Sequence, residues 1–255
     1  MLPSLFLAHG TPTLALEKHE YAEFLKGYAS EIPVPKAIVI LSAHWESSEQ
    51  TVTAVQKHGI IHDFTGFSEE LYDITYPAPG MLELADDILS LLAHAGVFAL
   101  LDNRRPLDHG AWVPLHIMYP NADIPVIPLS INPNLSNKRQ YEIGMALAEL
   151  RSKDVLIIGS GGIVHNPEEF RLDMDVAEGW AVYFEEWVEE KICNWELDDL
   201  FNYEALAPYA ISAVPTKEHF TPLLIAMGAG HENKDPRLLY RSFEYGNLSL
   251  TAWEF

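Results

Sequence analysis

The sequence predicts an α/β fold in which helices cover both faces of a central sheet. Short apolar runs rich in β-branched residues alternate along the chain with longer segments of helical periodicity. The apolar runs are continuous, which is typical of strands buried on both faces. The 255 residues show no repeat and no linker-like tract, so we expect a single domain over residues 1–255.

Six buried strands are expected from the apolar runs, at residues 4–8, 37–42, 51–55, 97–101, 126–131 and 155–158. The run Ala-Ile-Val-Ile-Leu-Ser at residues 37–42 shows the pattern most clearly, because its apolar residues follow one another without intervening polar residues. The last segment, residues 237–255, predicts two more strands around Tyr245-Gly246-Asn247. We expect this hairpin at an edge of the sheet.

Five helices are expected between the strands, at residues 17–30, 81–93, 136–152, 176–193 and 217–229. The helix at residues 81–93 places Leu84, Ile88 and Leu92 on one face. The helix at residues 176–193 carries a stripe that starts at Val176 and includes aromatic residues, which favours core packing over cofactor contact. Ser136 is a candidate N-cap for the third helix.

The charge balance argues against several classes of partner. Sixteen Lys and Arg residues face 37 Asp and Glu residues, giving a net charge of −21. Such a field repels nucleic acids and anionic membrane surfaces. A single cysteine, Cys193, indicates a reducing compartment, and neither a targeting segment nor a membrane span is visible, so we expect a cytoplasmic protein.

Three histidines follow three different predicted strands. His9 comes directly after the first strand, His44 follows the second, and His165 follows the strand at residues 155–158. Ligands of open α/β sheets bind at the carboxyl ends of the strands, so parallel strands would bring these imidazoles together. His219 is a fourth candidate, because Thr216 can cap a helix whose first turn contains it. Neutral imidazoles in such a cluster predict a transition-metal site.

Other sites find less support in the sequence. The loop Gly159-Ser160-Gly161-Gly162 follows a strand, but it lacks the glycine spacing and the lysine of phosphate-binding loops. No nucleophile motif of the GxSxG type is present. His94 stands in a polar helical context and is expected at the surface. Arg105, just before Asp108, is either part of a solvated turn or a partner for a substrate carboxylate.

Six segments together resemble the class III extradiol ring-cleavage dioxygenases, and most closely the 4,5-DOPA dioxygenase-like branch. They are, in family order, Leu7-Ala-His-Gly-Thr-Pro12, Ser42-Ala-His-Trp45, Ile61-His-Asp-Phe64, Tyr76-Pro-Ala-Pro-Gly80, Leu107-Asp-His-Gly-Ala-Trp112 and Gly159-Ser-Gly-Gly-Ile-Val-His-Asn166. Each motif alone is weak, whereas six in order over nearly the whole chain are a strong signal.

The resemblance implies a three-layer αβα fold with a mixed, mostly parallel sheet, and a mononuclear metal centre. It places His9, His44 and His219 at metal-site positions and His109 in the substrate pocket. His165 matches a ligand in this branch but an acid/base histidine in the wider class. The wider class uses two histidines and one carboxylate, so His219 stands where a carboxylate is expected, and its neighbour Glu218 is an alternative ligand.

The resemblance therefore predicts a dioxygenase that inserts O2 into a catechol, with Fe(II) for activity and Zn(II) as an alternative bound metal. We expect His109 and His165 to act as acid and base, and His62, Trp45 and Trp112 to contact the substrate. A zinc-dependent hydrolase on the same scaffold and a non-catalytic metal-binding protein are the alternatives. No nucleic acid or membrane partner is expected, and a homodimer is left open.

Overall fold

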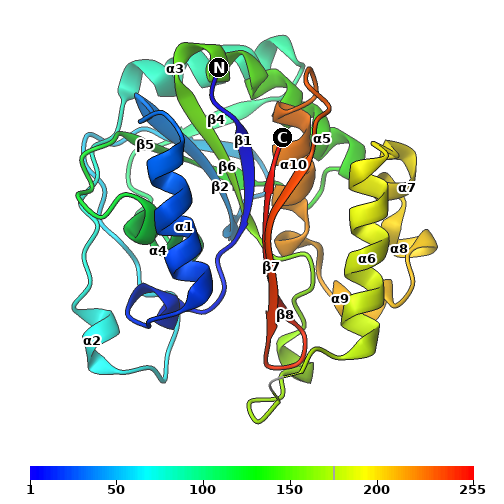
Figure 1. Ribbon diagram of the computed structural model, residues 1–255. Helices are drawn as coiled ribbons and strands as arrows, with labels where there is room; N and C mark the ends of the chain where they lie inside the picture. The colour runs from blue at the N-terminus through cyan, green and yellow to red at the C-terminus, as the bar shows by residue number, and fades with distance from the viewer. Residues whose placement is uncertain (175) are drawn as a thin grey trace.

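The computed structural model describes residues 1–174 and 176–255. Its strands are β1 (Ser4–Ala8), β2 (Ala37–Glu46), β3 (Gln50–Thr53), β4 (Ala99–Asp102), β5 (Val126–Ile131), β6 (Val155–Gly161), β7 (Arg237–Glu244) and β8 (Leu248–Glu254). They form one eight-stranded sheet in the order β4-β3-β5-β2-β6-β1-β8-β7 (Figure 1). Strands β1, β6, β2 and β5 are parallel, while β3 and the β7–β8 hairpin add antiparallel pairs.

Helices cover both faces of this sheet (Figure 1). They are α1 (Glu20–Glu31), α2 (Glu69–Tyr72), α3 (Leu82–His94), α4 (His109–Met118), α5 (Asn137–Leu147), α6 (Gly179–Cys193), α7 (Leu197–Phe201), α8 (Tyr203–Leu206), α9 (Ala210–Ala213) and α10 (Thr221–Ala229). Helices α1 and α4 pack on one face, and α3, α5 and α10 pack on the other. The predicted three-layer αβα architecture with a mixed sheet is confirmed.

The central strands are buried on both faces, as their continuous apolar sequence predicts. On β2, Ile38 and Ile40 contact the core under α1 and α4. Val39 and Leu41 alternate with them and contact the core under α3 and α5. All four side chains are fully buried. Burial on both faces explains why this strand carries no polar residue before Ser42.

A long segment between β3 and α3 lies outside the sheet and contains α2. An isolated bridge from Ile60 to Leu107 attaches it to the rest of the chain, and a second bridge, from Lys57 to Pro79, joins the two ends of the segment to each other. Tyr76 anchors it further, since its hydroxyl donates a hydrogen bond to the Tyr119 carbonyl at 2.9 Å. This segment carries His62 and the residues that follow it toward the carboxyl edge of the sheet.

Four features differ from the sequence prediction. The run expected as a buried strand at residues 97–101 forms the edge strand β4, in which Leu100 and Leu101 are 45% and 46% exposed. Residues 109–118 form helix α4, which the sequence does not predict, because Pro114 and burial on every side remove the usual amphipathic signal. Helix α6 begins at Gly179, and Val176 lies outside it with 71% of its surface exposed. The helix expected at residues 217–229 is a 3₁₀ turn, η4 (Lys217–His219), followed by α10.

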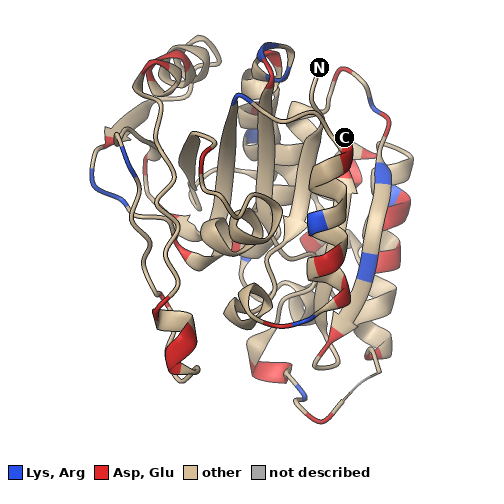
Figure 2. Ribbon diagram, turned by 60° about the vertical axis from the view of Figure 1, so that its left-hand side comes forward, with Lys and Arg blue, Asp and Glu red and all other residues tan. Residues whose placement is uncertain are grey.

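Acidic residues recur on the helices and loops around the sheet, and basic residues are sparse (Figure 2). This distribution agrees with the net charge of −21. Among the described residues, no helix combines the length and the apolar character needed to cross a bilayer.

Helices α5 and α10 approach each other so closely that Gly144 has no room for a side chain. A Cβ there would lie 1.9 Å from the Ile225 carbonyl oxygen. We expect Gly144→Ala to lower the free energy of unfolding by about 1–3 kcal/mol or more, because backbone must move. Gly27→Ala is the control, since nothing lies within 4 Å of a Cβ there, and alanine should raise helix stability by up to about 1 kcal/mol. Urea denaturation measures both, and a Gly144→Ala protein as stable as the wild type would contradict this packing.

Candidate metal centre

Five imidazoles meet at the carboxyl edge of the central parallel strands. His9 follows β1, His44 lies on β2, and His165 follows β6, as the sequence predicts. His109 is the first residue of α4, and His219 ends the 3₁₀ turn η4. Ring centroids of His9 and His44 are 4.8 Å apart, those of His44 and His109 are 3.9 Å apart, and those of His165 and His219 are 3.6 Å apart. Elements from both sides of the sheet therefore contribute to one cluster.

A hydrogen-bond chain fixes the proton on the His9 ring. The Ser160 hydroxyl donates its only hydrogen to the Gly110 carbonyl, so it accepts a bond from His9 Nδ1 at 3.1 Å. The Nε2 lone pair of His9 is then free, and it faces His44 Nε2 at 3.1 Å. Two ligands bound at right angles, each about 2.1 Å from a metal, would be about 3 Å apart. The separation of these two nitrogens fits a shared metal ion.

Buried polar groups hold His44 from behind. The Ser42 hydroxyl accepts the His44 backbone N–H and donates to the Asp108 carboxylate at 2.6 Å. Asp108 also caps helix α4 by accepting the Ala111 N–H. Arg105 donates to the His44 carbonyl and to Asp108, which makes it a support for the site rather than a solvated turn. These contacts join the end of β2 to the start of α4.

Gly110 is required for this junction. A Cβ at Gly110 would lie 2.4 Å from the Ser42 hydroxyl and 3.0 Å from the His44 ring. The first turn of α4 can therefore approach β2 only because this residue has no side chain. The motif that contains His109 thus includes a glycine for steric reasons.

Asp63 binds His109 twice. Its Oδ1 accepts both the backbone N–H of His109 at 3.1 Å and the ring Nδ1–H at 2.9 Å. The Nε2 lone pair of His109 is therefore free. Burial alone would raise the pKa of the Asp63 carboxyl, but the bonds from His109 hold it below its ordinary value. The other oxygen of Asp63 lies 3.8 Å from His44 Nδ1. Sequence reasoning missed Asp63, although it stands in the quoted segment beside His62.

Glu218 orients His219. The ring Nδ1–H donates to the Glu218 carboxylate at 3.0 Å, and Nε2 is buried without a partner among the described residues. Burial raises the pKa of Glu218, but hydrogen bonds from His219 and Thr216 outweigh burial and lower it to about 2. The expected N-cap Thr216 therefore bonds to a side chain instead of the helix backbone.

The glycines after strand 155–158 serve packing rather than phosphate binding. Gly161 belongs to β6, and a Cβ there would lie 2.1 Å from the His219 carbonyl oxygen. Gly162 N–H donates to the same carbonyl at 2.9 Å. The small residues of this motif let the turn η4 lie directly against β6, which places His219 beside His165.

Three of the clustered imidazoles are held in the neutral form. Burial lowers the pKa of His44 to about 2 and of His165 to about 3, with neighbouring histidines adding to the effect. Burial also holds the pKa of His9 well below its ordinary value. Neutral imidazole is the form that ligates transition metals. Potential ligand atoms lie within 4.8 Å of one another in two groups, His9 with His44 and His109, and His165 with Glu218 and His219.

The residues expected to contact substrate lie in different surroundings. The ring of His62 packs 5.4 Å from Tyr72 and 6.3 Å from Trp112. Phe64 lies 5.8 Å from His109 and extends this aromatic wall to the cluster. Trp45 is buried beneath the Arg105 guanidinium, whose carbon lies 5.4 Å from the ring centroid. Phe64 and Tyr72 are further candidates that sequence reasoning did not name.

Comparison with known families agrees with the geometry. The family model described as "Catalytic LigB subunit of aromatic ring-opening dioxygenase" matches residues 3–251. The chain belongs to this family. This LigB-family protein is 41% identical over 256 residues to a 4,5-DOPA dioxygenase extradiol of Beta vulgaris, covering 99% of this chain and 96% of that protein. It is 37% identical to a protein of the same name from Escherichia coli strain K12, covering 98% and 93%.

A solved structure extends the comparison to the fold. A crystal structure of an uncharacterized protein from Escherichia coli K12 matches with a TM-score of 0.86 at 32% identity, covering 100% of both chains. The LigB-family protein is accordingly an extradiol ring-cleaving dioxygenase, an oxidoreductase that acts on a small aromatic molecule and O2 with a metal cofactor. These findings favour the predicted dioxygenase over the hydrolase and the non-catalytic protein.

Replacement of either histidine delivered by a central strand tests the metal site. We expect His9→Ala and His44→Ala each to lose stoichiometric metal, because β1 and β2 fix both rings and no flexible neighbour can replace them. His94→Ala is the control, since this histidine is exposed on α3. Elemental analysis after reconstitution measures the metal content. Full metal content in a folded His9→Ala or His44→Ala protein would refute the assignment.

Proposed function

We propose that the enzyme uses Fe(II) to cleave catechols with an amino-acid side chain, of which DOPA is the type. The proposal rests on one observation, the convergence of five imidazoles on one strand edge beside an aromatic wall. The substrate class follows the names of the relatives, several of which are 4,5-DOPA dioxygenases. The further proposal that the protein acts in the cytoplasm rests on its single cysteine.

We propose His9, His44 and His219 as the residues that hold the metal. The free Nε2 of His9 and the orphaned, buried Nε2 of His219 support this set, since a bound ion would satisfy both. Fe(II) bound there would supply a path for electrons from a catechol to O2 and would favour the deprotonated catechol. Zn(II) suits the same imidazoles but has no redox chemistry.

His109 is the proposed base for the first phenolic proton. Its Nδ1–H is committed to Asp63, so Nε2 can accept a proton, and the carboxylate then stabilises the resulting imidazolium. His165 is the second candidate for proton transfer. Its low pKa keeps it neutral at physiological pH, and it stacks on His219 with 11° between the ring planes. His165 is equally placed to act as a fourth ligand.

The aromatic wall is the proposed surface for the catechol ring. His62 and Phe64 are half-buried and can face the ring. Trp112 is fully buried and packs behind Phe64, held by a hydrogen bond from its Nε1–H to the Ile61 carbonyl at 3.3 Å. Flat apolar rings favour a planar substrate and exclude water from the acid/base histidine beside them. Trp45, buried under Arg105, would act on substrate only through the position of β2.

Reconstitution with Fe(II) under anaerobic conditions tests the proposed reaction. On addition of air and L-DOPA, we expect equimolar O2 uptake and a new visible absorbance band from the ring-opened product. Protein loaded with Zn(II) should bind metal and give neither signal. Ester hydrolysis without O2 uptake by the zinc form would instead support the hydrolase.

The variant His109→Gln separates proton transfer from metal binding. We expect it to keep its metal and to lower turnover by roughly 10²–10⁴-fold, the usual effect of losing an acid/base group. Asp63→Asn should give a smaller loss, since it disturbs only the orientation of the ring. The same measurements on His165→Gln show whether that residue is a ligand, which loses metal, or an acid/base group, which keeps it. Loss of metal in His109→Gln, or wild-type turnover, would overturn the role given to His109.

A further inference from the structure

The ring of His165 is held differently from its neighbours in the cluster. Among the described residues, no hydrogen bond reaches its ring nitrogens, whereas Nδ1 of His9, His109 and His219 each donates to a serine or carboxylate oxygen. The backbone N–H of His165 donates to the Ala213 carbonyl at 3.0 Å. Hydrogen bonds therefore fix the chain at this residue but not the ring.

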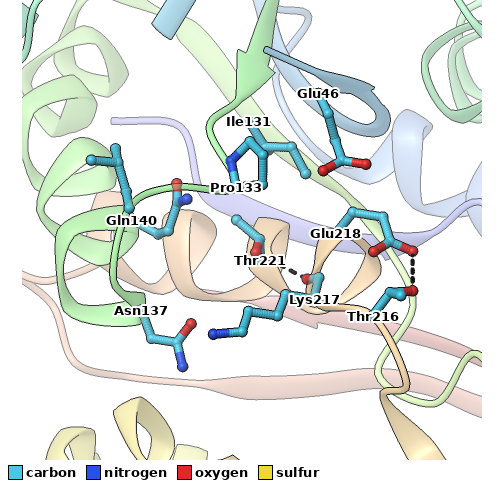
Figure 3. Close-up of a pocket in the computed structure, with 10 residues that line it drawn as sticks. Glu46, Ile131, Pro133, Asn137, Gln140, Thr216, Lys217, Glu218 and Thr221 are labelled. Carbon is cyan, nitrogen blue, oxygen red and sulfur yellow. Dashed lines mark hydrogen bonds between the residues drawn. The ribbon is translucent and has the colours of Figure 1, made fainter. Parts of the chain in front are cut away.

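The ring on which His165 stacks is itself fixed. His219 Nδ1–H donates to the Glu218 carboxylate, which also accepts a hydrogen bond from the Thr216 hydroxyl at 2.8 Å (Figure 3). The His165 ring centroid lies 3.6 Å from that of His219, with 11° between the planes. Stacking alone lets the His165 ring slide along its neighbour or tilt away from it, because the torsion that turns a histidine ring has broad minima. A second contact is needed to fix the ring.

Phe170 supplies this second contact. Its ring centroid lies 6.0 Å from that of His165, with 87° between the planes. Aromatic pairs favour such an edge-to-face arrangement. The His165 ring thus has a parallel neighbour in His219 and a perpendicular neighbour in Phe170. It can neither slide nor turn without losing one of the two contacts.

The turn between β7 and β8 holds the segment that carries Phe170 (Figure 1). Phe170 itself lies outside any helix or strand. The Glu169 carbonyl accepts a hydrogen bond from Asn247 Nδ2 at 2.7 Å, and the Arg171 N–H donates to the Tyr245 carbonyl at 2.9 Å. The Tyr245 ring also packs 5.9 Å from the Phe170 ring. The residues before and after Phe170 are therefore both attached to the turn, which keeps Phe170 against His165.

We propose that Phe170 is a positioning residue for ring cleavage, which acts by holding the His165 ring in its stacked orientation. The inference rests on the proposed function, because it deepens the role given there to His165. Either role requires a fixed ring, since a metal ligand must direct its lone pair at the ion and an acid/base group must lie within hydrogen-bond distance of the reacting oxygen. Hydrogen bonds meet this requirement for His109 and His219, and aromatic contacts meet it for His165.

Nuclear magnetic resonance of the metal-free protein tests the orientation of the ring. Nuclear Overhauser effects between the ring protons of His165 and His219 report the stacking, and His165→Gln identifies the His165 signals by their absence. We expect Phe170→Ala to lose these effects and Phe170→Tyr, which keeps an aromatic ring, to retain them. Phe170→Leu keeps apolar volume and replaces the alanine variant if that variant does not fold. Unchanged effects in the folded alanine or leucine variant would overturn the inference.

A double-mutant cycle tests whether Phe170 acts through His165. We expect Phe170→Ala to lower kcat of the Fe(II) enzyme for L-DOPA about 10-fold with little change in KM, and Phe170→Tyr to restore most of this loss. In a His165→Gln background, Phe170→Ala should cause no further loss, because the ring that it positions is absent. An equal loss in both backgrounds would contradict the inference. If His165→Gln has no measurable activity, the resonance experiment decides alone.

Leu172→Ala is the matched control. Leu172 belongs to the same segment but is 81% exposed, so its truncation should change neither the Overhauser effects nor kcat. Absence of ring cleavage by the wild-type Fe(II) enzyme would refute the proposed function. The resonance experiment would still decide whether Phe170 orients His165, because it needs neither metal nor turnover.

Discussion

The parallel pairing of β1, β6 and β2 is the constraint on which the rest of the site depends. Ser160 of β6 pairs with Leu7 on one side and with Ser42 on the other. This register sets the ends of three strands at one level, so that residues just beyond Ala8 and Ser42 meet above Ser160. The serine hydroxyl then bonds to both His9 and Gly110. A shift of one residue in any of the three strands would turn a histidine toward the opposite face.

Contacts behind the histidines matter as much as the histidines themselves. Ser160, Asp63 and Glu218 each accept a hydrogen bond from a ring Nδ1–H, and the Nε2 atom of the same ring is left without a proton. Protonation of these closely spaced, poorly solvated rings is unfavourable, which agrees with the low pKa values of His44 and His165. A metal ion compensates this arrangement because it replaces the missing protons. Metal affinity is thus prepared by residues that need not touch the metal.

Local sequence patterns predicted the frame and part of the site. Continuous apolar runs predicted the buried central strands but not the exposure of Leu100 and Leu101 on the edge strand β4, and strand ends placed His9, His44 and His165 near one another. Helix α4 was not predicted, because a buried helix that contains Pro114 shows neither amphipathic periodicity nor a favourable composition. The roles of Asp63 and of Gly110 depend on contacts between distant segments, and no local pattern encodes those. Asp63 and Gly110 both stand in segments that resemble the family, but the resemblance alone does not explain why an aspartate and a glycine are needed there.

The segment between β3 and α3 carries residues proposed to contact the substrate, whereas the proposed metal ligands lie on other elements. The clustered histidines stand on or just after sheet strands, on the turn η4 and at the start of α4, whereas His62, Asp63 and Phe64 belong to a segment outside the sheet, attached by the Ile60–Leu107 bridge and the Tyr76 hydrogen bond. Insertions and substitutions in such a segment are tolerated more readily than changes in central strands. Descendants of this scaffold could therefore exchange one aromatic substrate for another while the inherited metal chemistry stays intact. The choice of substrate, set by this segment, would then change faster in evolution than the metal chemistry, which is set by the histidines.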